Sequence, residues 1–566
     1  AAFAVLERAL DFMNENGKPF EAALAATRAG NLFTTHTPVA AGFDRFSPPL
    51  MNLYLKWYAT ERLHISFDDL MALGRANRGD SNEPFNMAYL AARGAGAING
   101  VSKLHSAVSR SIFLPLFPRW PVEEIPIGSV TNGVHMASWD SISADRLWSE
   151  ACGEDRWLST NEGLRDRIRS VPDEALWKLR SDNCEELVRF VRLRVGRQMA
   201  GYGASQEDIE RAKAIFDPNA LTLGFARRFA TYKRPNLLLH DTERLARILI
   251  NPKSPVQLVI AGKAHPADQA GKAMIREWIH FVRRPDIRQH AVFLIDYDML
   301  LAQRIVEGVD AWINTPRRPW EACGTSGMKV LANGGVNISE LDGWWAEAYA
   351  PDVGWSLGDG KEHGDDPAWD AAEALQLYEM LENDVIPRFY DRGANGLPRK
   401  WIAMMRESMA RLTPEYSANR AVRQYTEQCY LPAAAAYRQR EASRGALGER
   451  IAQWHNSVAE HWPQLGFGHV QAKTAGDFHN FQAEVYLSGL EPEAVLVELY
   501  APPLNGGPSA REPMTRCEAV AGAANAFTYV GQVASNRPAG DYTPRIIPAL
   551  AGVNVPLEAN QILWQR

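Results

Sequence analysis

The residues with the clearest chemical potential are a lysine and the small, flexible loop that precedes it. Residues 321–329 read Glu-Ala-Cys-Gly-Thr-Ser-Gly-Met-Lys, and Asn-Gly-Gly follows at residues 333–335. A lysine held in this way can act as an amine, provided that burial or a carbonyl cofactor offsets its preference for the charged form. Taken alone, Lys329 is better explained as a solvated lysine, because charged side chains are rarely buried. Its chemistry therefore depends on its neighbours in the fold.

Basic side chains also follow two apolar runs elsewhere in the chain. Arg227, Arg228 and Lys233 come after Leu-Thr-Leu-Gly-Phe, and Lys263 comes after Val-Ile-Ala-Gly. An Arg-Arg pair alone is typical of a solvated helix start. Beside the lysine loop, however, these cations indicate a site for a small anion.

Short apolar runs alternate with helix-length intervals in the middle of the chain. These runs are residues 221–225, 256–261, 291–295, 311–313 and 335–338. The pattern predicts βαβ units and a parallel sheet, in which ligands bind at the carboxyl ends of the strands. Arg227, Arg228, Lys263, Tyr297 and Glu321 all follow such runs, so we expect one crevice to collect them.

Together with Asn-Met-Ala at residues 86–88 and Asn-Gly-Val-Ser-Lys-Leu-His at residues 99–105, these segments resemble the alpha-glucan phosphorylases, the glycogen and starch phosphorylase family. The resemblance covers roughly residues 30–435. It implies retaining phosphorolysis of α-1,4-glucans such as glycogen, starch or maltodextrin, with release of glucose 1-phosphate. It also implies an α/β fold of the GT-B glycosyltransferase type and pyridoxal 5′-phosphate as cofactor.

The resemblance assigns roles to individual residues. Lys329 matches the lysine that forms a Schiff base with pyridoxal phosphate. In this family the phosphate group of the cofactor relays a proton, because its second pKa is about 6. Arg228 and Lys233 match the residues that hold the attacking inorganic phosphate. The other implied cofactor contacts are Arg227, Thr325 and Tyr297, with Lys263 also lining that pocket. Tyr297 is equally well explained as a core aromatic.

The implied sugar contacts come from the same loop and from one upstream turn. Glu321, Cys323 and Gly324 match the loop that binds the glucosyl hydroxyls, and Asn132 matches a further contact. Asn132 is equally well explained as part of an Asn-Gly turn. In our comparison Gly96 occupies the place of a family histidine that contacts the sugar. We expect that contact to be lost or to be supplied by His36 or His135.

The opening residues predict a helix that is already under way, without an initiator Met or a cap. We therefore interpret the sequence as a fragment. The family places a Gly-rich loop and a helix amino terminus against the cofactor phosphate, and no such segment precedes Leu32. We expect these 566 residues alone to bind the cofactor weakly and to show little phosphorolysis.

Composition excludes several classes of protein. With 46% hydrophobic and 23% charged residues, the chain is typical of a globular protein. Its net charge of −6 does not favour nucleic-acid binding. No apolar run approaches the roughly 20 residues that span a bilayer. The five cysteines form no CxxC pair and the histidines show no metal-ligand spacing, so we expect a reducing cytoplasm and no metal.

Three domains are predicted along the chain. Residues 1–205 form the carboxyl-terminal part of a first Rossmann-like domain, mostly helical, with helices over 85–108 and 175–199 and a loop at 127–135. Residues 206–440 form a second Rossmann-like domain with the cofactor lysine. Residues 441–566 form a helix, over 448–461, and a small antiparallel β-sandwich. Homo-oligomer formation is compatible with this sequence.

Other functions remain open at this stage. The main enzymatic alternative is a sugar-nucleotide glycosyltransferase of the same architecture, which needs no Schiff base. A glycoside hydrolase that uses Asp342 and Glu347 is weaker, because nothing places these carboxylates on opposite sides of a sugar bond. A non-catalytic protein that binds glucan through its carboxyl-terminal sandwich is the alternative outside enzymology.

Overall fold

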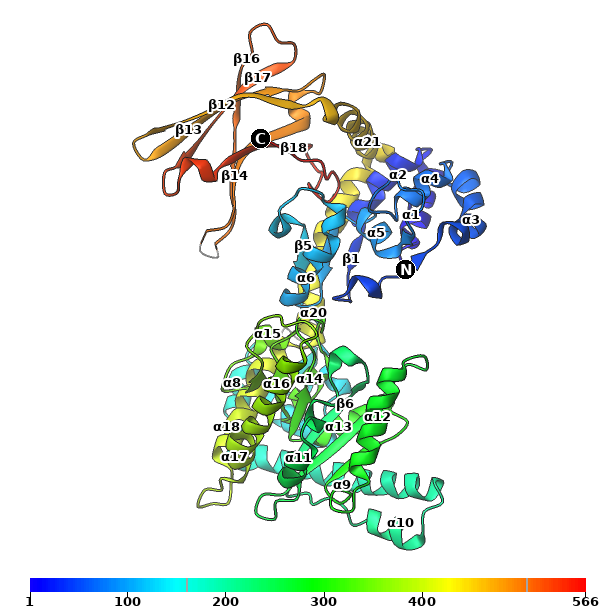
Figure 1. Cartoon of the computed structure of the whole chain (residues 1–566), viewed down its shortest axis with the longest axis vertical. Helices are drawn as coiled ribbons and strands as arrows, with labels where there is room; N and C mark the ends of the chain where they lie inside the picture. The colour runs from blue at the N-terminus through cyan, green and yellow to red at the C-terminus, as the bar shows by residue number, and fades with distance from the viewer. Residues whose placement is uncertain (159–160, 505–506, 566) are drawn as a thin grey trace.

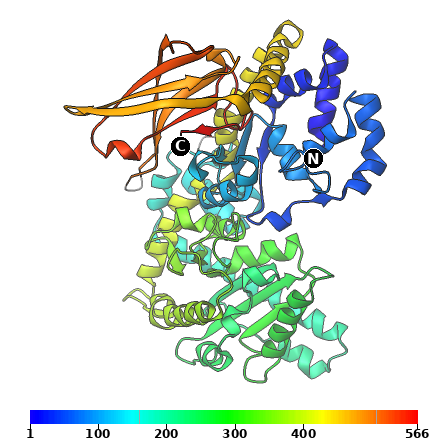
Figure 2. The same ribbon diagram turned by 45° about the horizontal axis from the view of Figure 1, so that its top comes forward.

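The computed structural model describes residues 1–158, 161–504 and 507–565. Figure 1 shows a lower part built around a parallel sheet, an upper part with the amino-terminal helices, and a β-rich part at the upper left. Figure 2 shows the same three parts in a second view. Within the described ranges, no helix combines the length and the apolar character needed to cross a bilayer.

The amino-terminal part contains a three-stranded parallel sheet in the order β1-β4-β5. Its strands are β1 (Leu32–Thr34), β4 (Ala97–Gly100) and β5 (Ile127–Ser129). The helices of this part are α1 (Ala4–Asn16), α2 (Phe20–Thr27), α3 (Pro48–Trp57), α4 (Phe67–Ala72), α5 (Met87–Arg93) and α6 (Lys103–Phe113). A small ribbon of β2 (Arg45–Phe46) and β3 (Phe85–Asn86) lies beside them.

Two sequence predictions in this part are wrong. The helix predicted over 85–108 is interrupted, because β4 lies between α5 and α6. The loop predicted over 127–135 begins with β5. Strands of three or four residues are too short to show a period of two, so the pattern along the chain does not reveal them.

The central sheet has six parallel strands in the order β11-β10-β9-β6-β7-β8. They are β6 (Leu221–Arg228), β7 (Val256–Lys263), β8 (Ala291–Leu294), β9 (Ala311–Asn314), β10 (Val336–Glu340) and β11 (Gly354–Leu357). The five predicted apolar runs are confirmed as β6 to β10. The sequence does not predict β11, because this edge strand reads Gly-Trp-Ser-Leu and has no continuous apolar run.

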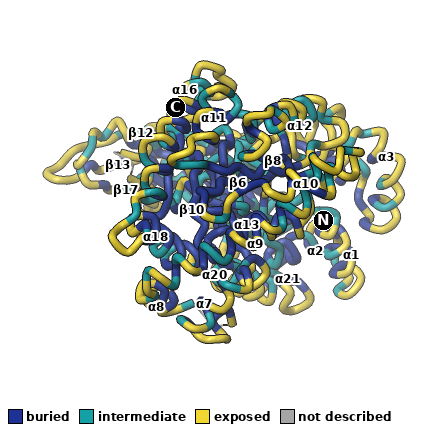
Figure 3. The backbone as a smooth tube through the Cα atoms, turned by 90° about the horizontal axis from the view of Figure 1, so that it is seen from below, coloured by how far each residue is buried: buried dark blue, intermediate teal, exposed yellow. Residues whose placement is uncertain are grey.

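Helices cover both faces of the central sheet. Leu223 and Phe225 of β6 belong to a core with α11 (Thr242–Leu249), α12 (Gln269–Val282) and α16 (Pro367–Met380). Ala226 of β6 and Val259 of β7 belong to a second core with α9 (Asp173–Gly201) and α13 (Met299–Gly308). Figure 3 shows β6, β8 and β10 as buried elements at the centre. The faces are thus filled, and only strand ends can offer a binding site.

Packing crosses the predicted domain boundaries. The helix predicted over 175–199 is confirmed within α9, and it packs on the central sheet, where Arg180 pairs with Asp310 at 2.6 Å. α21 (Leu431–His461), which is broken by a kink at residues 442–445, packs against α2, and Arg440 donates to the Ala25 carbonyl at 2.6 Å. Segments before residue 205 therefore belong spatially with the central sheet, and segments near residue 440 belong with the amino-terminal helices.

The carboxyl-terminal residues form two four-stranded antiparallel sheets, β12-β13-β17-β16 and β15-β14-β18-β19. Their strands are β12 (Gly466–Ala475), β13 (Phe478–Tyr486), β14 (Val495–Ala501), β15 (Ala510–Pro513), β16 (Thr515–Ala519), β17 (Ala526–Ala534), β18 (Thr543–Pro548) and β19 (Leu563–Trp564). Val485 of β13 and Leu499 of β14 share one hydrophobic core. The predicted helix over 448–461 lies within α21.

The structure contains further helices. They are α7 (Ile142–Cys152), α8 (Leu164–Arg169), α10 (Gln206–Ala212), α14 (Ser326–Lys329), α15 (Trp345–Ala348), α17 (Ile386–Tyr390), α18 (Arg399–Glu407), α19 (Thr413–Glu415) and α20 (Ala418–Tyr425).

Candidate active site

The order of the central strands creates a crevice at the carboxyl ends of β6 and β9. From β6 the chain proceeds outward through β7 to β8, and from β9 it proceeds in the opposite direction through β10 to β11. Connections that diverge in this way leave room for a ligand between neighbouring strand ends. Arg227 and Arg228 end β6, and the loop after β9 leads to Glu321. The predicted cations and the predicted substrate loop therefore meet at one place.

Glu321 is held by two cations. Its Oε2 accepts hydrogen bonds from Arg227 Nη2 at 3.0 Å and from Lys233 Nζ at 2.5 Å. Burial alone would raise the pKa of Glu321, but the charges of Lys233 and Arg227 outweigh it and lower this pKa. Burial, with the charge of Arg227, lowers the pKa of Lys233 to about 8. Glu321 is therefore ionised at neutral pH. Lys233 loses its proton at a pH slightly above neutral.

The cluster keeps a surplus of positive charge. Arg227, Arg228 and Lys233 are three cations around the single carboxylate of Glu321. Nε and Nη1 of Arg227 are buried and make no hydrogen bond with any described residue. A buried polar group without a partner costs about 1–3 kcal/mol. An anion that accepts these N–H groups would remove that cost, so the cluster is suited to bind phosphate.

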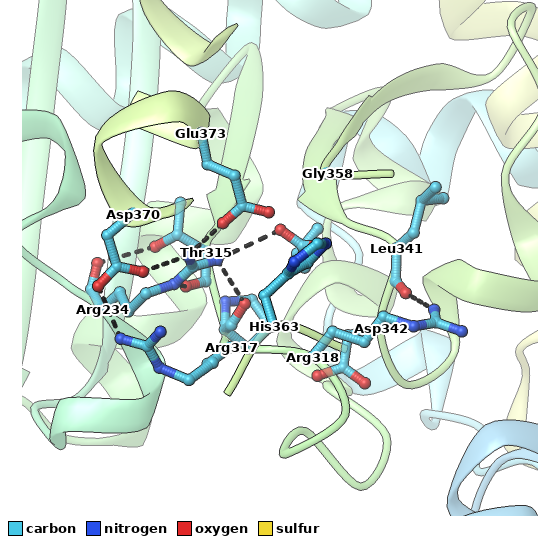
Figure 4. Close-up of polar contacts among 12 residues, drawn as sticks. Arg234, Thr315, Arg317, Arg318, Leu341, Asp342, Gly358, His363, Asp370 and Glu373 are labelled. Carbon is cyan, nitrogen blue, oxygen red and sulfur yellow. Dashed lines mark hydrogen bonds and ion pairs between the residues drawn. The ribbon is translucent and has the colours of Figure 1, made fainter. Parts of the chain in front are cut away.

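Arg234 fixes the segment that carries Lys233. Its guanidinium donates to the carbonyls of Thr315 at 3.1 Å and Pro316 at 2.8 Å, in the loop that leads to Glu321. Figure 4 shows this guanidinium surrounded by carboxylates. Its ion-pair partners are Glu340, Asp370 and Glu373. Arg234 thus joins the two loops that form the anion site.

Lys329 lies in apolar surroundings at the end of α14. Its Nζ is 3.7 Å from the centre of the Trp139 ring. In the part of the chain that the structure describes, this amine has no hydrogen bond and no ion pair. Burial lowers the pKa of Lys329. The amine is therefore neutral more often than a solvated lysine, which is what amine chemistry requires.

Asn333 links the lysine helix to the segment of Trp139. Its Nδ2 donates to the Trp139 carbonyl at 2.7 Å, and its Oδ1 accepts from the Ser141 amide at 2.8 Å. Asn333 is 4% exposed. Buried amides of this kind restrict the relative position of two segments, because both of their polar ends need partners. The position of Trp139 beside Lys329 thus depends on Asn333.

The other predicted cofactor contacts lie near these groups. Tyr297 follows β8, and burial raises its pKa, although the nearby charge of Arg227 opposes this rise. Thr325 directly precedes α14 and is half-buried. Lys263 ends β7 and is exposed, and its carbonyl accepts a hydrogen bond from the Phe229 amide at 2.8 Å.

Cys323 and Asn132 come together where the upper and lower parts meet. Burial raises the pKa of the Cys323 thiol to about 12, although a hydrogen bond from the Asn132 backbone opposes the rise. Ser102, at the start of α6, donates to the Ala322 carbonyl at 2.8 Å. Gly324 ends this loop with a φ of +86°. Both parts of the molecule therefore contact the predicted sugar loop.

The two histidines considered as sugar contacts belong to other segments of the chain. His36 is exposed and lines a cavity of about 1040 Å³ near the first residues of the chain. His135 is exposed, with its Nδ1 at 2.8 Å from Ser138 Oγ. Among the described residues, neither histidine has a hydrogen bond or ion pair with residues 321–324.

Gly96 occupies a position without room for a side chain. Its amide donates to the Asn31 carbonyl at 2.9 Å. A Cβ atom at residue 96 would lie 3.0 Å from Cα of Ala29, which is backbone and cannot easily move. A larger residue here would require the two backbone segments to separate by a few tenths of an ångström.

Comparison with known proteins agrees with this geometry. A family model described as carbohydrate phosphorylase matches residues 2–349. The chain belongs to the carbohydrate phosphorylase family. It is 37% identical to a glycogen phosphorylase of Mycobacterium tuberculosis and 35% identical to a maltodextrin phosphorylase of Thermococcus litoralis. Each comparison covers 97% of this chain and 64% of the relative. A glycogen phosphorylase of Aquifex aeolicus is 38% identical over 74% of this chain and 59% of its own length. The chain thus spans less than two thirds of the length of these relatives.

In this member of the phosphorylase family, the carboxylates considered for a hydrolase bind other parts of the protein. Glu347 accepts a hydrogen bond from Thr131 Oγ1 at 2.7 Å and pairs with Lys103 at 3.6 Å. Asp342 accepts hydrogen bonds from the amides of Glu321 and Gly343 at 2.9 and 2.7 Å. Both carboxylates thus hold backbone segments or neighbouring side chains together.

Several residues shape the candidate site in ways that the sequence did not predict. They are Ser102, Trp139, Arg234 and Asp342. Arg234 directly follows the predicted cation Lys233, and that adjacency was the only signal along the chain. The other three reach the site from distant segments, so their roles depend on the fold.

Proposed function

We propose that the complete protein catalyses retaining phosphorolysis of α-1,4-glucans, in which inorganic phosphate releases glucose 1-phosphate from the non-reducing end. The observation that carries this proposal is the buried cation cluster on Glu321, with two unpartnered nitrogens on Arg227. Family membership and the names of the relatives support the reaction class.

Arg228 and Lys233 are the proposed ligands of the attacking phosphate. Two phosphate groups that face one another repel strongly unless fixed cations neutralise them at short range. Three cations against one carboxylate meet this requirement without leaving a large excess of charge. In this proposal Arg227 faces the phosphate of the cofactor, and Arg228 and Lys233 face the substrate phosphate.

The residues present fit pyridoxal 5′-phosphate. Lys329 would attach it, because its amine is partly buried, free of ion pairs with described residues, and close to the face of Trp139. Arg227 and Thr325 would contact its phosphate, and Tyr297 would line its pocket. When bound, the cofactor supplies a phosphate group that can exchange a proton near neutral pH.

Glu321 can serve the cations and a sugar at the same time. Both cations bind Oε2, and Oε1 has no hydrogen bond from any described residue. Oε1 is therefore available to accept a glucosyl hydroxyl. Cys323, Gly324 and Asn132 are the other proposed sugar contacts, and Cys323 lies beside the Asn132 backbone. His36 and His135 remain the proposed replacements for the sugar contact that Gly96 cannot make.

The finer features of the fold are also proposals. The strand order of the central sheet is that of a doubly wound nucleotide-binding fold. This supports a GT-B arrangement of two Rossmann-like domains, divided along the sequence near residues 205 and 440, in which α9 packs with the second domain and α21 packs with the first. The two antiparallel sheets with a shared core support a β-sandwich over residues 441–566. A cytoplasmic homo-oligomer that binds glucan and phosphate completes the proposal.

The reaction is tested by incubating the full-length protein with maltodextrin and inorganic phosphate. We expect glucose 1-phosphate to accumulate, and the remaining glucan to shorten from its non-reducing end. Transfer of glucose from a sugar nucleotide, without phosphate-dependent release, would instead support the glycosyltransferase alternative. Glucan binding without either reaction would support a binding protein.

A pH prediction follows from Lys233. Because only the protonated amine attracts phosphate, we expect the apparent affinity for phosphate to fall as the pH rises through about 8, the pKa of Lys233. KM for phosphate, measured from neutral to alkaline pH, reports this loss. Lys233→Arg is the matched control, because its guanidinium stays protonated throughout this range. An identical alkaline loss in wild type and Lys233→Arg would assign it to another group.

A further inference from the structure

The segment after β10 lies directly against the proposed sugar loop. Asp342 Oδ2 accepts a hydrogen bond from the Glu321 amide at 2.9 Å. The Trp344 amide donates to the Cys323 carbonyl at 2.9 Å. Ser102 holds the carbonyl between these two residues, at Ala322. Three successive residues of the loop are thus fixed through their backbone.

Gly343 allows this close approach. Its φ is +52°, and a Cβ atom there would lie 2.3 Å from the Cys323 carbonyl oxygen. Any side chain at residue 343 would therefore separate the two backbones. The Asp342 side chain is fixed at the same step, because its Oδ1 also accepts a hydrogen bond from the Gly343 amide at 2.7 Å.

The environment of Asp342 is costly for a carboxylate. The residue is 2% exposed, and burial raises its pKa to about 7, while the amides of Glu321 and Gly343 oppose the rise. Its charged neighbours are Glu321, Arg318 and Glu340. Figure 4 shows Asp342 next to Leu341, whose carbonyl accepts from Arg318. An asparagine could offer an acceptor to only one of the two amides, since its NH₂ group is a donor.

We propose that Asp342 is a positioning residue that fixes the backbone of Glu321, so that Oε2 stays on Arg227 and Lys233 while Oε1 is available to the sugar. Without this acceptor, the Glu321 amide would be left without its partner and the loop would open more often. The consequence for catalysis rests on the proposed function. The restraint on the loop does not, and it can be measured separately.

Cys323 provides a reporter for this restraint. The thiol is 4% exposed and lies within the loop, whereas Cys184 is fully buried in α9. A buried thiol reacts with iodoacetamide only when its segment opens. In Asp342→Asn we expect labelling of Cys323 to accelerate roughly tenfold, and labelling of Cys184 to stay as in the wild type. Peptide mapping by mass spectrometry distinguishes the two thiols.

Asp241→Asn is the matched control, because Asp241 caps α11 away from the loop and asparagine caps helices equally well. Unchanged labelling of Cys323 both in Asp342→Asn and in Asp342→Ala, which offers no acceptor to the Glu321 amide, would overturn the proposal, whether or not the enzyme is active. If both thiols become reactive, the variant has lost its fold. The restraint is then tested by measuring hydrogen exchange of the Glu321 amide in the wild-type protein. There the Glu321 amide must exchange slowly. Exchange at the rate of an exposed loop amide would overturn the proposal as well.

When Asp342→Asn remains folded, its kinetics distinguish the restraint of the loop by Asp342 from the sugar contact proposed for Glu321. We expect KM for maltodextrin to rise about tenfold, because the loop that presents Oε1 is less often in place. A faster Cys323 reaction with an unchanged KM would leave the loop restraint intact and contradict the sugar role of Glu321. That result would count against the proposed function, not against the positioning role of Asp342.

Discussion

Lys329→Ala is expected to lose the cofactor and phosphorolysis together. The proposed proton relay depends on the cofactor phosphate, and acid–base catalysis of this kind contributes roughly 10²- to 10⁴-fold to a rate. A loss of about a thousandfold in kcat is therefore the expected effect. Lys329→Arg should behave similarly, because it keeps the charge but cannot form the covalent link. Cofactor content and kcat are measured on the same preparations of the full-length protein.

Lys400→Ala is the control for this loss. Lys400 lies on α18, is exposed, and pairs with Asp391 at 3.0 Å. Its removal should leave both cofactor content and kcat unchanged, because surface ion pairs contribute little. Full activity of Lys329→Ala would show that another lysine binds the cofactor or that the reaction does not need it.

Arg228→Ala has the second largest expected effect, and it is specific for phosphate. The variant removes a charge-assisted hydrogen bond to the attacking anion, which is worth about 1.5–3 kcal/mol. KM for phosphate should therefore rise roughly 10- to 150-fold, while KM for maltodextrin should change less than about threefold. Initial rates with each substrate varied in turn provide both constants.

Arg283→Ala tests whether any exposed arginine has this effect. Arg283 follows α12 on the surface, away from the crevice at the end of β6. Its removal should change neither constant. Equal increases of both constants in Arg228→Ala would indicate that Arg228 supports the fold of the loop and does not contact phosphate.

The sequence predicts the central part of the site because strand ends are readable along the chain. Arg227 and Arg228 follow a continuous apolar run, and in a parallel sheet such positions meet at one edge. The structure places Arg227, Lys233 and Glu321 in direct contact. Their roles toward cofactor and substrates came from the family resemblance, and these roles remain predictions.

Other features depend on contacts between distant segments. Trp139 lies against Lys329, and Ser102 bonds to the sugar loop, although long stretches of chain separate each pair. No periodicity or spacing along the chain contains that information. Asp342 shows a further difficulty, since an Asp-Gly step is also typical of a simple turn. Only the structure shows that the carboxylate of Asp342 accepts a hydrogen bond from the Glu321 amide.

The short strands mark a second limit. Residues 97–100 lie between two helices and read Ala-Ile-Asn-Gly, with only two apolar residues in succession. The sequence analysis therefore predicts one helix where the structure has a helix, a strand and a helix. Their position is determined by parallel pairing with β1 and β5. Pairing of this kind is a property of the folded sheet, and a strand of four residues carries too little pattern to predict it.

The central claim is that Lys329 holds pyridoxal phosphate, and borohydride reduction of the full-length protein tests it most directly. Reduction makes the link between the lysine and the cofactor permanent, so that peptide mapping can locate it. We predict one pyridoxyl adduct, on Lys329 in the peptide that contains Met328. An adduct on Lys263 or any other lysine, or no adduct in an active preparation, would contradict the account.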